Sequence, residues 1–493
     1  MLFNSLEFLI FFPVVTLLYF LLPHRWRWLH LLIASCIFYM FFIPVYILIL
    51  IFTIIIDYIA GILIEDAQGS RRKLYLMMSL VANIGVLAVF KYYNFFIGNV
   101  NEMLHHIGMQ AHNIPLLNII LPIGLSFHTF QAMSYTIEVY RGHQPAERHF
   151  GIYSLYVMFY PQLVAGPIER PQNLLWQFRE EHHFDYRQVV SGLRLMAWGM
   201  FKKVVIADRL CILVNGVYND PQHYHGVAVI LAMIFFSIQI YCDFSGYSDI
   251  AIGSARVMGF HLMRNFNRPY FSKTIAEFWK RWHISLSTWF KDYLYISLGG
   301  NRVARWKWYR NIFIVFMVSG LWHGANWTFI VWGALHGIYQ IAGSLLEPVK
   351  KRLREMAHVS EKSMWYRLQQ MTVIFVLVTV AWVFFRANTF SDAFTVLQHS
   401  VMGLGSDIST IIHTHKIFQV IGYFKGIELL DWMIIPVALA LLLAVDKMQS
   451  HVGMQEWFSQ RSPVLRWCVY FAAVYGILFF GKFEETQFIY FQF

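Results

Sequence analysis

Two short stretches, each centred on a Trp-His pair, decide how this chain is interpreted. Residues 277–287 read Glu-Phe-Trp-Lys-Arg-Trp-His-Ile-Ser-Leu-Ser, and residues 318–327 read Val-Ser-Gly-Leu-Trp-His-Gly-Ala-Asn-Trp. His283 lies among charged residues, whereas His323 lies between apolar runs. An ionisable side chain at membrane depth is costly and usually serves a function. The two histidines are therefore the candidate functional centre, and much of the remaining chain is expected to be their scaffold.

The composition around these stretches is that of a membrane protein. Of the 493 residues, 58% are hydrophobic and only 14% are charged, whereas soluble domains carry about 25% charged residues. The net charge of +11 does not indicate a nucleic-acid partner, because the basic residues flank apolar spans rather than forming a continuous stripe. They are typical of cytoplasmic anchors and of contacts with an anionic donor.

The apolar segments predict an all-α integral membrane protein with about 10–12 membrane-spanning helices. No repeat, linker or low-complexity tract divides the chain, so we expect one membrane domain over residues 1–493. The apolar segments fall at 6–22, 28–43, 44–64, 73–96, 118–140, 188–216, 224–241, 309–321, 326–346, 364–386, 431–447 and 463–481. The four cysteines have neither disulfide-like nor zinc-like spacing, so we expect buried thiols and no metal site.

The distribution of Lys and Arg predicts the orientation of the first half. The connection after the first span carries Arg25 and Arg27, and residues 71–73 are Arg-Arg-Lys. The alternate connection, residues 99–115, carries no Lys or Arg. The positive-inside rule then places the N-terminus outside the cytoplasmic membrane.

Two segments are predicted to depart from simple spanning helices. Residues 159–171 hold three prolines and a glycine, which forbid a continuous helix and indicate a broken or re-entrant element. Residues 273–298 are amphipathic and too charged to span, so we expect this segment to lie in the membrane interface or to dip partway into the membrane.

Asp243 and Asp249 are carboxylates in an otherwise apolar region. They either line a polar cavity or pair with basic neighbours such as Arg256 or Arg268. The residues alone leave both interpretations open.

Three roles compete for His323. It can be a general base, because a histidine pKa lies near neutrality. It can be a metal ligand, although no H-x-x-x-H spacing is present. It can also be a core histidine that satisfies a hydrogen bond. The small neighbours Ser319, Gly320 and Gly324 favour open space around the ring and a ligand passage between helices.

Several segments of the chain resemble those of the membrane-bound O-acyltransferases. Residues 279–287 and 319–327 are similar to the two signature segments of that family. Four further segments resemble the bacterial branch of the family: residues 159–171, residues 239–253, Arg268-Pro269-Tyr270 and the C-terminal Phe-Ile-Tyr-Phe-Gln-Phe. That branch acetylates alginate and peptidoglycan or transfers D-alanine to teichoic acid. Segment order and chain length resemble the alginate type most.

The resemblance implies a ring of helices around a central tunnel, with His323 as the catalytic histidine and His283 as its partner. It implies acetyl transfer from a cytoplasmic thioester, acetyl-CoA, for O-acetylation of an extracytoplasmic polysaccharide in a bacterial inner membrane. It further implies an SGNH-type partner protein, and no bound cofactor. The candidates for donor binding or tunnel lining are Lys280, Arg281, Trp282, Ser285, Ser319, Trp322, Asn326, Trp327 and Asp243.

The residues themselves are compatible with this chemistry, because acyl transfer needs a base and hydrogen-bond donors for the oxyanion. No Gly-x-Ser-x-Gly elbow is present, so a serine acyl-enzyme is not indicated. The alternatives are peptidoglycan O-acetylation, D-alanyl transfer to teichoic acid, and a transporter without chemistry, which would also use broken helices and buried polar groups. A transporter has no need of the paired Trp-His segments.

Overall fold

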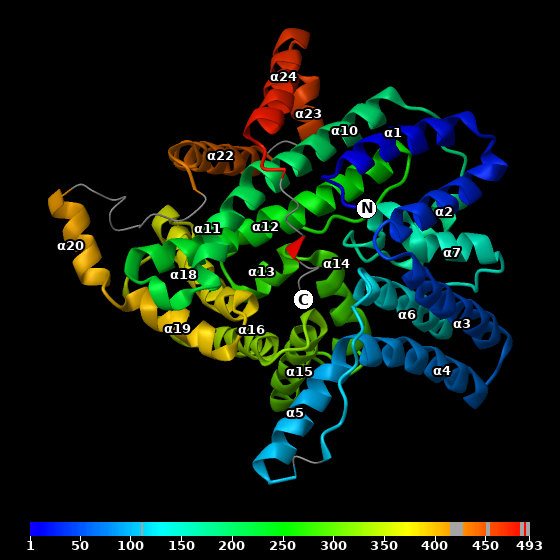
Figure 1. Cartoon of the computed structure of the whole chain (residues 1–493), viewed down its shortest axis with the longest axis horizontal. Helices are drawn as coiled ribbons and strands as arrows, with labels where there is room; N and C mark the ends of the chain where they lie inside the picture. The colour runs from blue at the N-terminus through cyan, green and yellow to red at the C-terminus, as the bar shows by residue number, and fades with distance from the viewer. Residues whose placement is uncertain (110–111, 415–426, 450–453, 484–487, 490–493) are drawn as a thin grey trace. The chain divides into compact units, whose positions relative to one another are not determined.

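The computed structural model describes residues 1–109, 112–414, 427–449, 454–483 and 488–489. Over these residues the regular structure is helical, which confirms the expected all-α class (Figure 1). The chain forms two compact units, one of residues 1–196 and 247–264 and one of residues 197–246 and 265–493. The helices α10 (Tyr186–Met200) and α12 (Gly226–Val257) each contribute residues to both units.

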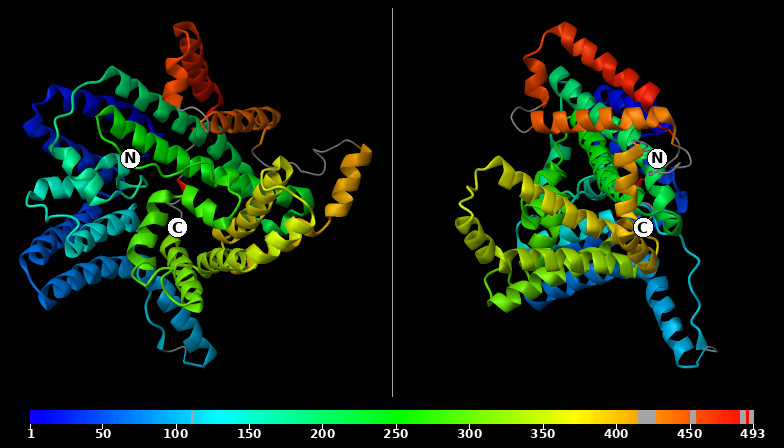
Figure 2. Two further views of the ribbon diagram at one scale, coloured as in Figure 1. Left: turned by 180° about the vertical axis from the view of Figure 1, so that it is seen from behind. Right: turned by 90° about the vertical axis from the view of Figure 1, so that its left-hand side faces the viewer.

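The first unit is built on a bundle of apolar helices. In chain order its leading elements are α1 (Leu6–Leu21), α2 (His24–Met40), η1 (Pro44–Tyr46), α3 (Ile47–Asp66), α4 (Ser70–Leu87), the π-helical η2 (Ala88–Tyr92), α5 (Tyr93–His106) and α6 (Leu125–Arg141). Helices α3, α4 and α6 pack against one another (Figure 2). A Cβ atom added to Gly61 of α3 would lie 2.6 Å from the ring of Tyr135 on α6, so glycine allows this close approach.

A buried polar cluster joins the same three helices. The carboxylate of Asp57 accepts hydrogen bonds from Ser79 Oγ at 2.6 Å and Asn83 Nδ2 at 2.9 Å. Ser79 Oγ also lies 3.1 Å from Thr136 Oγ1 of α6. Because each of these polar side chains has a protein partner, the bundle can bury them at an acceptable cost.

The predicted break over residues 159–171 is confirmed. Helix α7 (Phe150–Met158) is followed by the single turns α8 (Tyr160–Leu163) and α9 (Pro171–Leu174), and residues 159–169 are all buried. The backbone carbonyl of Tyr156 accepts from the amides of Gln131 at 2.5 Å and Gln162 at 2.9 Å. Side-chain donors thus satisfy a backbone group near the break, as irregular structure at membrane depth requires. After η4 (Trp176–Arg179) the chain enters α10.

The second unit carries both signature histidines. Its elements are η5 (Phe201–Ala207), α11 (Asp208–Tyr218), η6 (Pro221–His223), η7 (Pro269–Phe271), α13 (Ile275–Arg281), α14 (Ile284–Trp289), η8 (Phe290–Tyr295), α15 (Arg305–His323), α16 (Trp327–Leu345), α17 (Glu347–Met356), α18 (Met364–Arg386), α19 (Phe390–Val401), α20 (Leu404–Thr414), α22 (Leu429–Met448), α23 (Met454–Ser459) and α24 (Pro463–Phe480). Three short helical segments occupy residues 273–298, and the left-handed conformation of His283 separates the first, α13, from α14.

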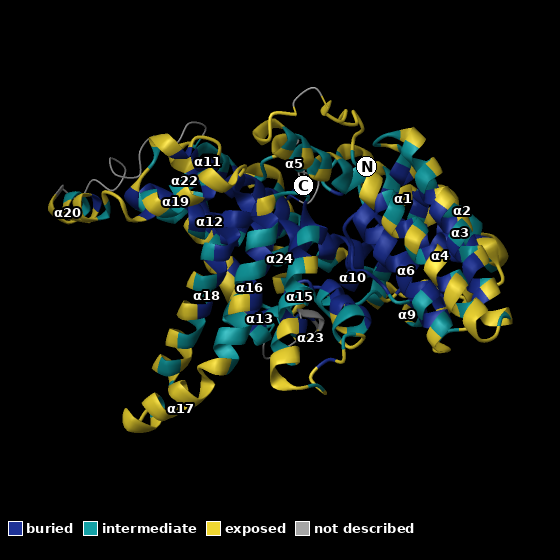
Figure 3. Cartoon of the chain, turned by 90° about the horizontal axis from the view of Figure 1, so that it is seen from below, coloured by how far each residue is buried: buried dark blue, intermediate teal, exposed yellow. Residues whose placement is uncertain are grey.

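Six helices of the described residues are long and apolar enough to cross a membrane. The bent pair α16 and α17 makes a seventh, and α1 is a shorter apolar helix. Other segments expected to span are shorter or carry charges; residues 188–216, for example, divide into α10, η5 and α11 around buried lysines. The difference from the expected 10–12 spans arises because hydropathy alone does not reveal these breaks. Figure 3 shows that α12 is buried over much of its length, whereas α17 is exposed.

Candidate acyl-transfer site

His283 is held at the break between α13 and α14 by Asn265. Helix α13 starts with Thr274, whose hydroxyl accepts from the Glu277 backbone N–H at 3.0 Å, and ends just before Trp282. His283 follows with φ +43° and a completely buried side chain. A left-handed non-glycine residue is uncommon, and such strain often marks a functional position.

The hydrogen bonds of Asn265 fix the tautomer of His283. Asn265 Oδ1 accepts from the backbone N–H of Ser285 at 3.3 Å and from Ser285 Oγ at 3.0 Å. Because a backbone N–H can only donate, this atom is the amide oxygen, and His283 Nδ1 at 3.1 Å must donate to it. In the neutral ring Nε2 is then the hydrogen-bond acceptor. Burial lowers the pKa of His283 to about 3, so the ring stays neutral at physiological pH.

His323 is the last residue of α15 and is buried beside α16. The prediction of open space beside Gly320 and Gly324 is wrong. A Cβ on Gly320 would lie 2.4 Å from the backbone oxygen of Phe329, and one on Gly324 would lie 2.1 Å from the Phe329 ring. These glycines allow α15 and α16 to pack closely, and they leave no ligand passage at either position.

An aromatic cluster brings the two histidines together. The Trp322 ring contacts both imidazoles, with centroid distances of 6.2 Å to His283 and 4.9 Å to His323. His323 also packs against Trp332 at 4.9 Å and Phe385 at 5.3 Å. One indole ring thus contacts two histidines that are forty positions apart in the sequence.

His336 belongs to the same cluster, because Trp332 contacts both His323 and His336. It is completely buried, and its Nδ1 accepts a hydrogen bond from Trp279 Nε1 at 3.2 Å. Its ring lies 5.0 Å from Trp332. The pattern Gly-Ala-Leu-His-Gly around it predicts helix packing, and the contact with Trp279 shows which residue it packs against.

The remaining candidates differ in how close they come to this cluster. Trp282 is buried against Trp382, at a centroid distance of 5.0 Å. Ser285 is buried and bonded to Asn265, and Ser319 is buried in the last turns of α15. Lys280 is exposed.

Two other candidates have local roles instead, and a third is exposed. Arg281 forms an ion pair with Glu277 at 2.6 Å. Asn326 caps α16, accepting from the Thr328 N–H at 3.0 Å. Trp327, the first residue of α16, is 54% exposed.

Asp243 pairs with a basic residue, but not with the neighbours expected. Its carboxylate lies 2.8 Å from Lys203 Nζ, which also binds Asp208 at 2.8 Å. The other carboxylate oxygen accepts from the backbone N–H of Ile489 at 2.9 Å. All three charged side chains are buried.

Phe244, the residue after Asp243, links the C-terminal segment to His283. Phe488 packs on Phe244 at 5.7 Å, and the Phe244 ring lies 4.6 Å from the His283 ring. Residues 490–493 of the C-terminal pattern lie outside the described residues. Sequence reasoning missed Lys203 and Asn265; the signal available for Lys203 was a Lys-Lys pair within an apolar run.

Several known proteins are similar to this chain. The profile of the membrane-bound O-acyltransferase family, MBOAT, matches residues 143–380, which include both histidines. The chain is 40% identical to the probable alginate O-acetylase AlgI of Pseudomonas aeruginosa, over 81% of this chain and 74% of that protein. It is 32% identical to the peptidoglycan O-acetyltransferase of Helicobacter pylori, over 100% of this chain and 98% of that protein.

A more distant relative is the teichoic acid D-alanyltransferase of Bacillus subtilis, 28% identical over 52% of this chain and 67% of that protein. The apolar helices and these sequence similarities both indicate a membrane-bound acyltransferase. The chain therefore belongs to the membrane-bound O-acyltransferase family and is a multi-pass membrane acyltransferase.

Proposed function

We propose that this protein transfers an acetyl group from cytoplasmic acetyl-CoA for the O-acetylation of an extracytoplasmic polysaccharide. The acceptor is alginate or another exopolysaccharide, reached with the help of an SGNH-type partner protein. The protein acts in the bacterial inner membrane with its N-terminus outside, an orientation supported by the basic residues near Arg25 and Arg71–Lys73.

The observation that carries the proposal is the placement of two buried imidazoles on one indole ring. His323 takes the role of general base. It accepts the proton of an acceptor hydroxyl while the oxygen attacks the thioester carbonyl carbon. A C–O bond forms, the C–S bond breaks, and the proton passes to the departing thiolate.

His283 takes a different role, because its Nδ1–H is committed to Asn265. Its Nε2 accepts a hydrogen bond, and an amide N–H of the donor's pantetheine arm is a suitable partner. The indole N–H of Trp322 is the candidate donor to the oxyanion, since Trp322 contacts both rings.

The test compares a deletion strain with strains carrying the wild-type or His323→Ala protein. Ester-linked acetate is released by mild base from purified exopolysaccharide and, separately, from peptidoglycan. Loss of acetate from the exopolysaccharide in the deletion and His323→Ala strains, restored by the wild type, is the expected result. Unchanged acetate in both polymers contradicts the proposal.

Peptidoglycan is the second candidate acceptor, because the Helicobacter pylori relative matches over the whole chain. Loss of acetate from peptidoglycan alone would select this acceptor. D-alanyl transfer rests on a match over only 52% of the chain, and ester-linked alanine measured in the same extracts tests it.

A further inference from the structure

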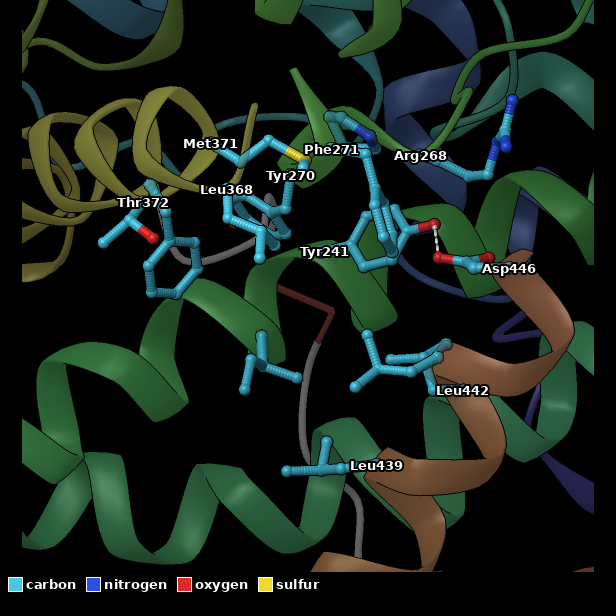
Figure 4. A pocket seen from close by; sticks show the side chains of 14 residues that line it. Tyr241, Arg268, Tyr270, Phe271, Leu368, Met371, Thr372, Leu439, Leu442 and Asp446 are labelled. Atoms are coloured by element: carbon cyan, nitrogen blue, oxygen red, sulfur yellow. Dashed lines mark hydrogen bonds between the residues drawn. The ribbon is translucent and has the colours of Figure 1, made fainter. Parts of the chain in front are cut away.

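A cavity of about 400 Å³ lies in the second unit between α18 and α22, closed behind by α12 and η7 (Figure 4). Apolar side chains make most of its wall, among them Leu368 and Phe375 of α18 and Leu439 and Leu442 of α22. Its volume is within the range of about 300–1,000 Å³ typical of ligand pockets.

The cavity does not lead to the histidines. Tyr270 stands in its wall, donates its hydroxyl to the Ser237 carbonyl at 2.5 Å and accepts from Trp382 Nε1 at 3.2 Å. On its other side this ring contacts Trp282, at 6.0 Å. A ligand in the cavity is therefore separated from the aromatic cluster by a hydrogen-bonded ring.

The cavity is short enough to lie within one leaflet of the membrane. Both flanking helices qualify as membrane spans. The wall extends from Leu368 to Phe375 on α18 and from Leu439 to Asp446 on α22. With a rise of 1.5 Å per residue, each stretch is about 10 Å long, which fits inside one half of a hydrocarbon core about 30 Å thick.

The mouth of the cavity opens towards lipid. Thr372 of α18 and Leu443 of α22 line it and are also exposed on the outer surface of the unit. Val376, one turn along α18 from Thr372, is exposed but does not line the cavity. In a membrane this opening faces acyl chains, so a lipid chain is the group that can enter it laterally.

Basic residues gather at the same end of both helices. Arg268 lines the cavity, Arg367 is exposed in the first turn of α18, and Lys447 is exposed in the last turn of α22. The exposed helix α17, which precedes α18, adds Lys350 and Lys351. The positive-inside rule assigns this end to the cytoplasmic side, where anionic lipids bind basic pockets between helices.

One carboxylate also lines the cavity and must be accounted for. Asp446 is buried and accepts a hydrogen bond from Tyr241 Oη at 3.2 Å. Figure 4 shows this pair beside the apolar wall. The Lys202 ammonium lies 5.9 Å from the Tyr241 ring centroid, so this tyrosine contacts both a carboxylate and a cation.

We propose that this cavity binds one anionic phospholipid of the cytoplasmic leaflet. An acyl chain fills the space between α18 and α22, and the phosphate lies by Arg268 and Lys447. The lipid is a structural ligand that holds α22 against α18 and supports the wall formed by Tyr270.

The occupancy test uses the full-length protein purified in mild detergent from its own membrane. Phospholipid that remains bound is extracted and quantified per protein by mass spectrometry. Thr372→Trp places an indole in the mouth of the cavity, and Val376→Trp is the matched control on the same helix. We expect about one retained phospholipid in the wild type and in Val376→Trp, and at least a fivefold loss in Thr372→Trp.

The headgroup test removes two charges. The double variant Arg268→Gln/Lys447→Gln should lose its enrichment of anionic over zwitterionic lipid. Lys350→Gln/Lys351→Gln, with the same change in net charge, should keep it. Added phosphatidylglycerol should raise the Tm of the wild type more than phosphatidylcholine does, and neither should raise that of Thr372→Trp.

Three outcomes would overturn the proposal. Equal lipid retention in Thr372→Trp and Val376→Trp would mean that the cavity does not hold the lipid. A retained lipid pool with the headgroup composition of the membrane would contradict the anionic preference. A non-phospholipid ligand lost in Thr372→Trp would assign the cavity to a different occupant.

Discussion

Asn265 Oδ1 accepts a hydrogen bond from His283 Nδ1 at 3.1 Å and thereby decides which nitrogen of His283 can accept one. Asn265→Ala leaves His283 and Ser285 without this acceptor, at a cost of about 1–3 kcal/mol for each buried donor. We expect a lower Tm and a loss of O-acetylation larger than the loss of folded protein.

The control for this prediction is Asn267→Ala, because Asn267 is only half-buried and its side chain bonds to the neighbouring Arg268 at 3.4 Å. Acetate per mole of folded protein and melting in detergent are measured for both variants. If Asn265→Ala keeps wild-type activity per folded mole, the positioning role of Asn265 is refuted.

His323→Ala should abolish detectable O-acetylation, because loss of a general base lowers rates by about 10²–10⁴-fold. His336→Ala should instead reduce stability, since it removes a buried ring and the acceptor of Trp279. Activity per folded mole should remain substantial in that variant.

Polymer acetate and detergent melting curves separate the two effects. A His323→Ala protein that is folded but still acetylates would show that His323 is structural. The same conclusion would follow if activity disappeared only with the protein itself.

Lys280→Ala with Arg281→Ala should weaken acetyl-CoA binding more than it slows transfer from bound donor. Lys280 is exposed, whereas Arg281 is held by Glu277, so most of the effect should come from Lys280. Binding measured by calorimetry should differ from the wild type most at low salt, because salt screens exposed charges. If the variant and the wild type bind acetyl-CoA with the same affinity at both low and moderate salt, these residues do not belong to the donor site.

Asp243→Asn leaves an acceptor for the Ile489 N–H but removes one of the two carboxylates that bind Lys203. Breaking a buried ion pair typically costs about 3–5 kcal/mol, so the Tm should fall. Asp243→Asn with Lys203→Met should recover part of the loss. If the Tm of this double variant is no higher than that of Asp243→Asn, the unpaired charge on Lys203 is not the cause of the lower Tm.

The predicted orientation places the connection between α3 and α4 in the cytoplasm, because Arg71, Arg72 and Lys73 follow it directly. A Ser70→Cys variant should resist a membrane-impermeant thiol reagent in intact cells and react after permeabilisation. The native exposed thiol, Cys468, is replaced by Ser in the background used. Ready labelling in intact cells would reverse the topology.

The broken element over residues 159–171 could be predicted from sequence alone, since proline removes an N–H and clashes with the preceding turn whatever its surroundings. The left-handed turn at His283 could not. It is stabilised by hydrogen bonds that His283 and Ser285 donate to Asn265 Oδ1. Asn265 lies eighteen residues before His283, and no local pattern encodes such a partner. The prediction of open space beside Gly320 and Gly324 was wrong for a related reason. A glycine can admit a ligand or a neighbouring helix, and here Phe329 of α16 occupies the space.

The sequence by itself determined that this is a helical membrane protein and which two histidines are the candidates for catalysis, because hydropathy and the Trp-His segments are properties of the chain. Only the tertiary structure decided that Trp322 joins those histidines, that His336 lies in the same cluster, and that Asp243 binds Lys203 and the Ile489 backbone. These partners are distant in sequence. Their pairing depends on how helices stack and on the cost of burying an unpaired polar group.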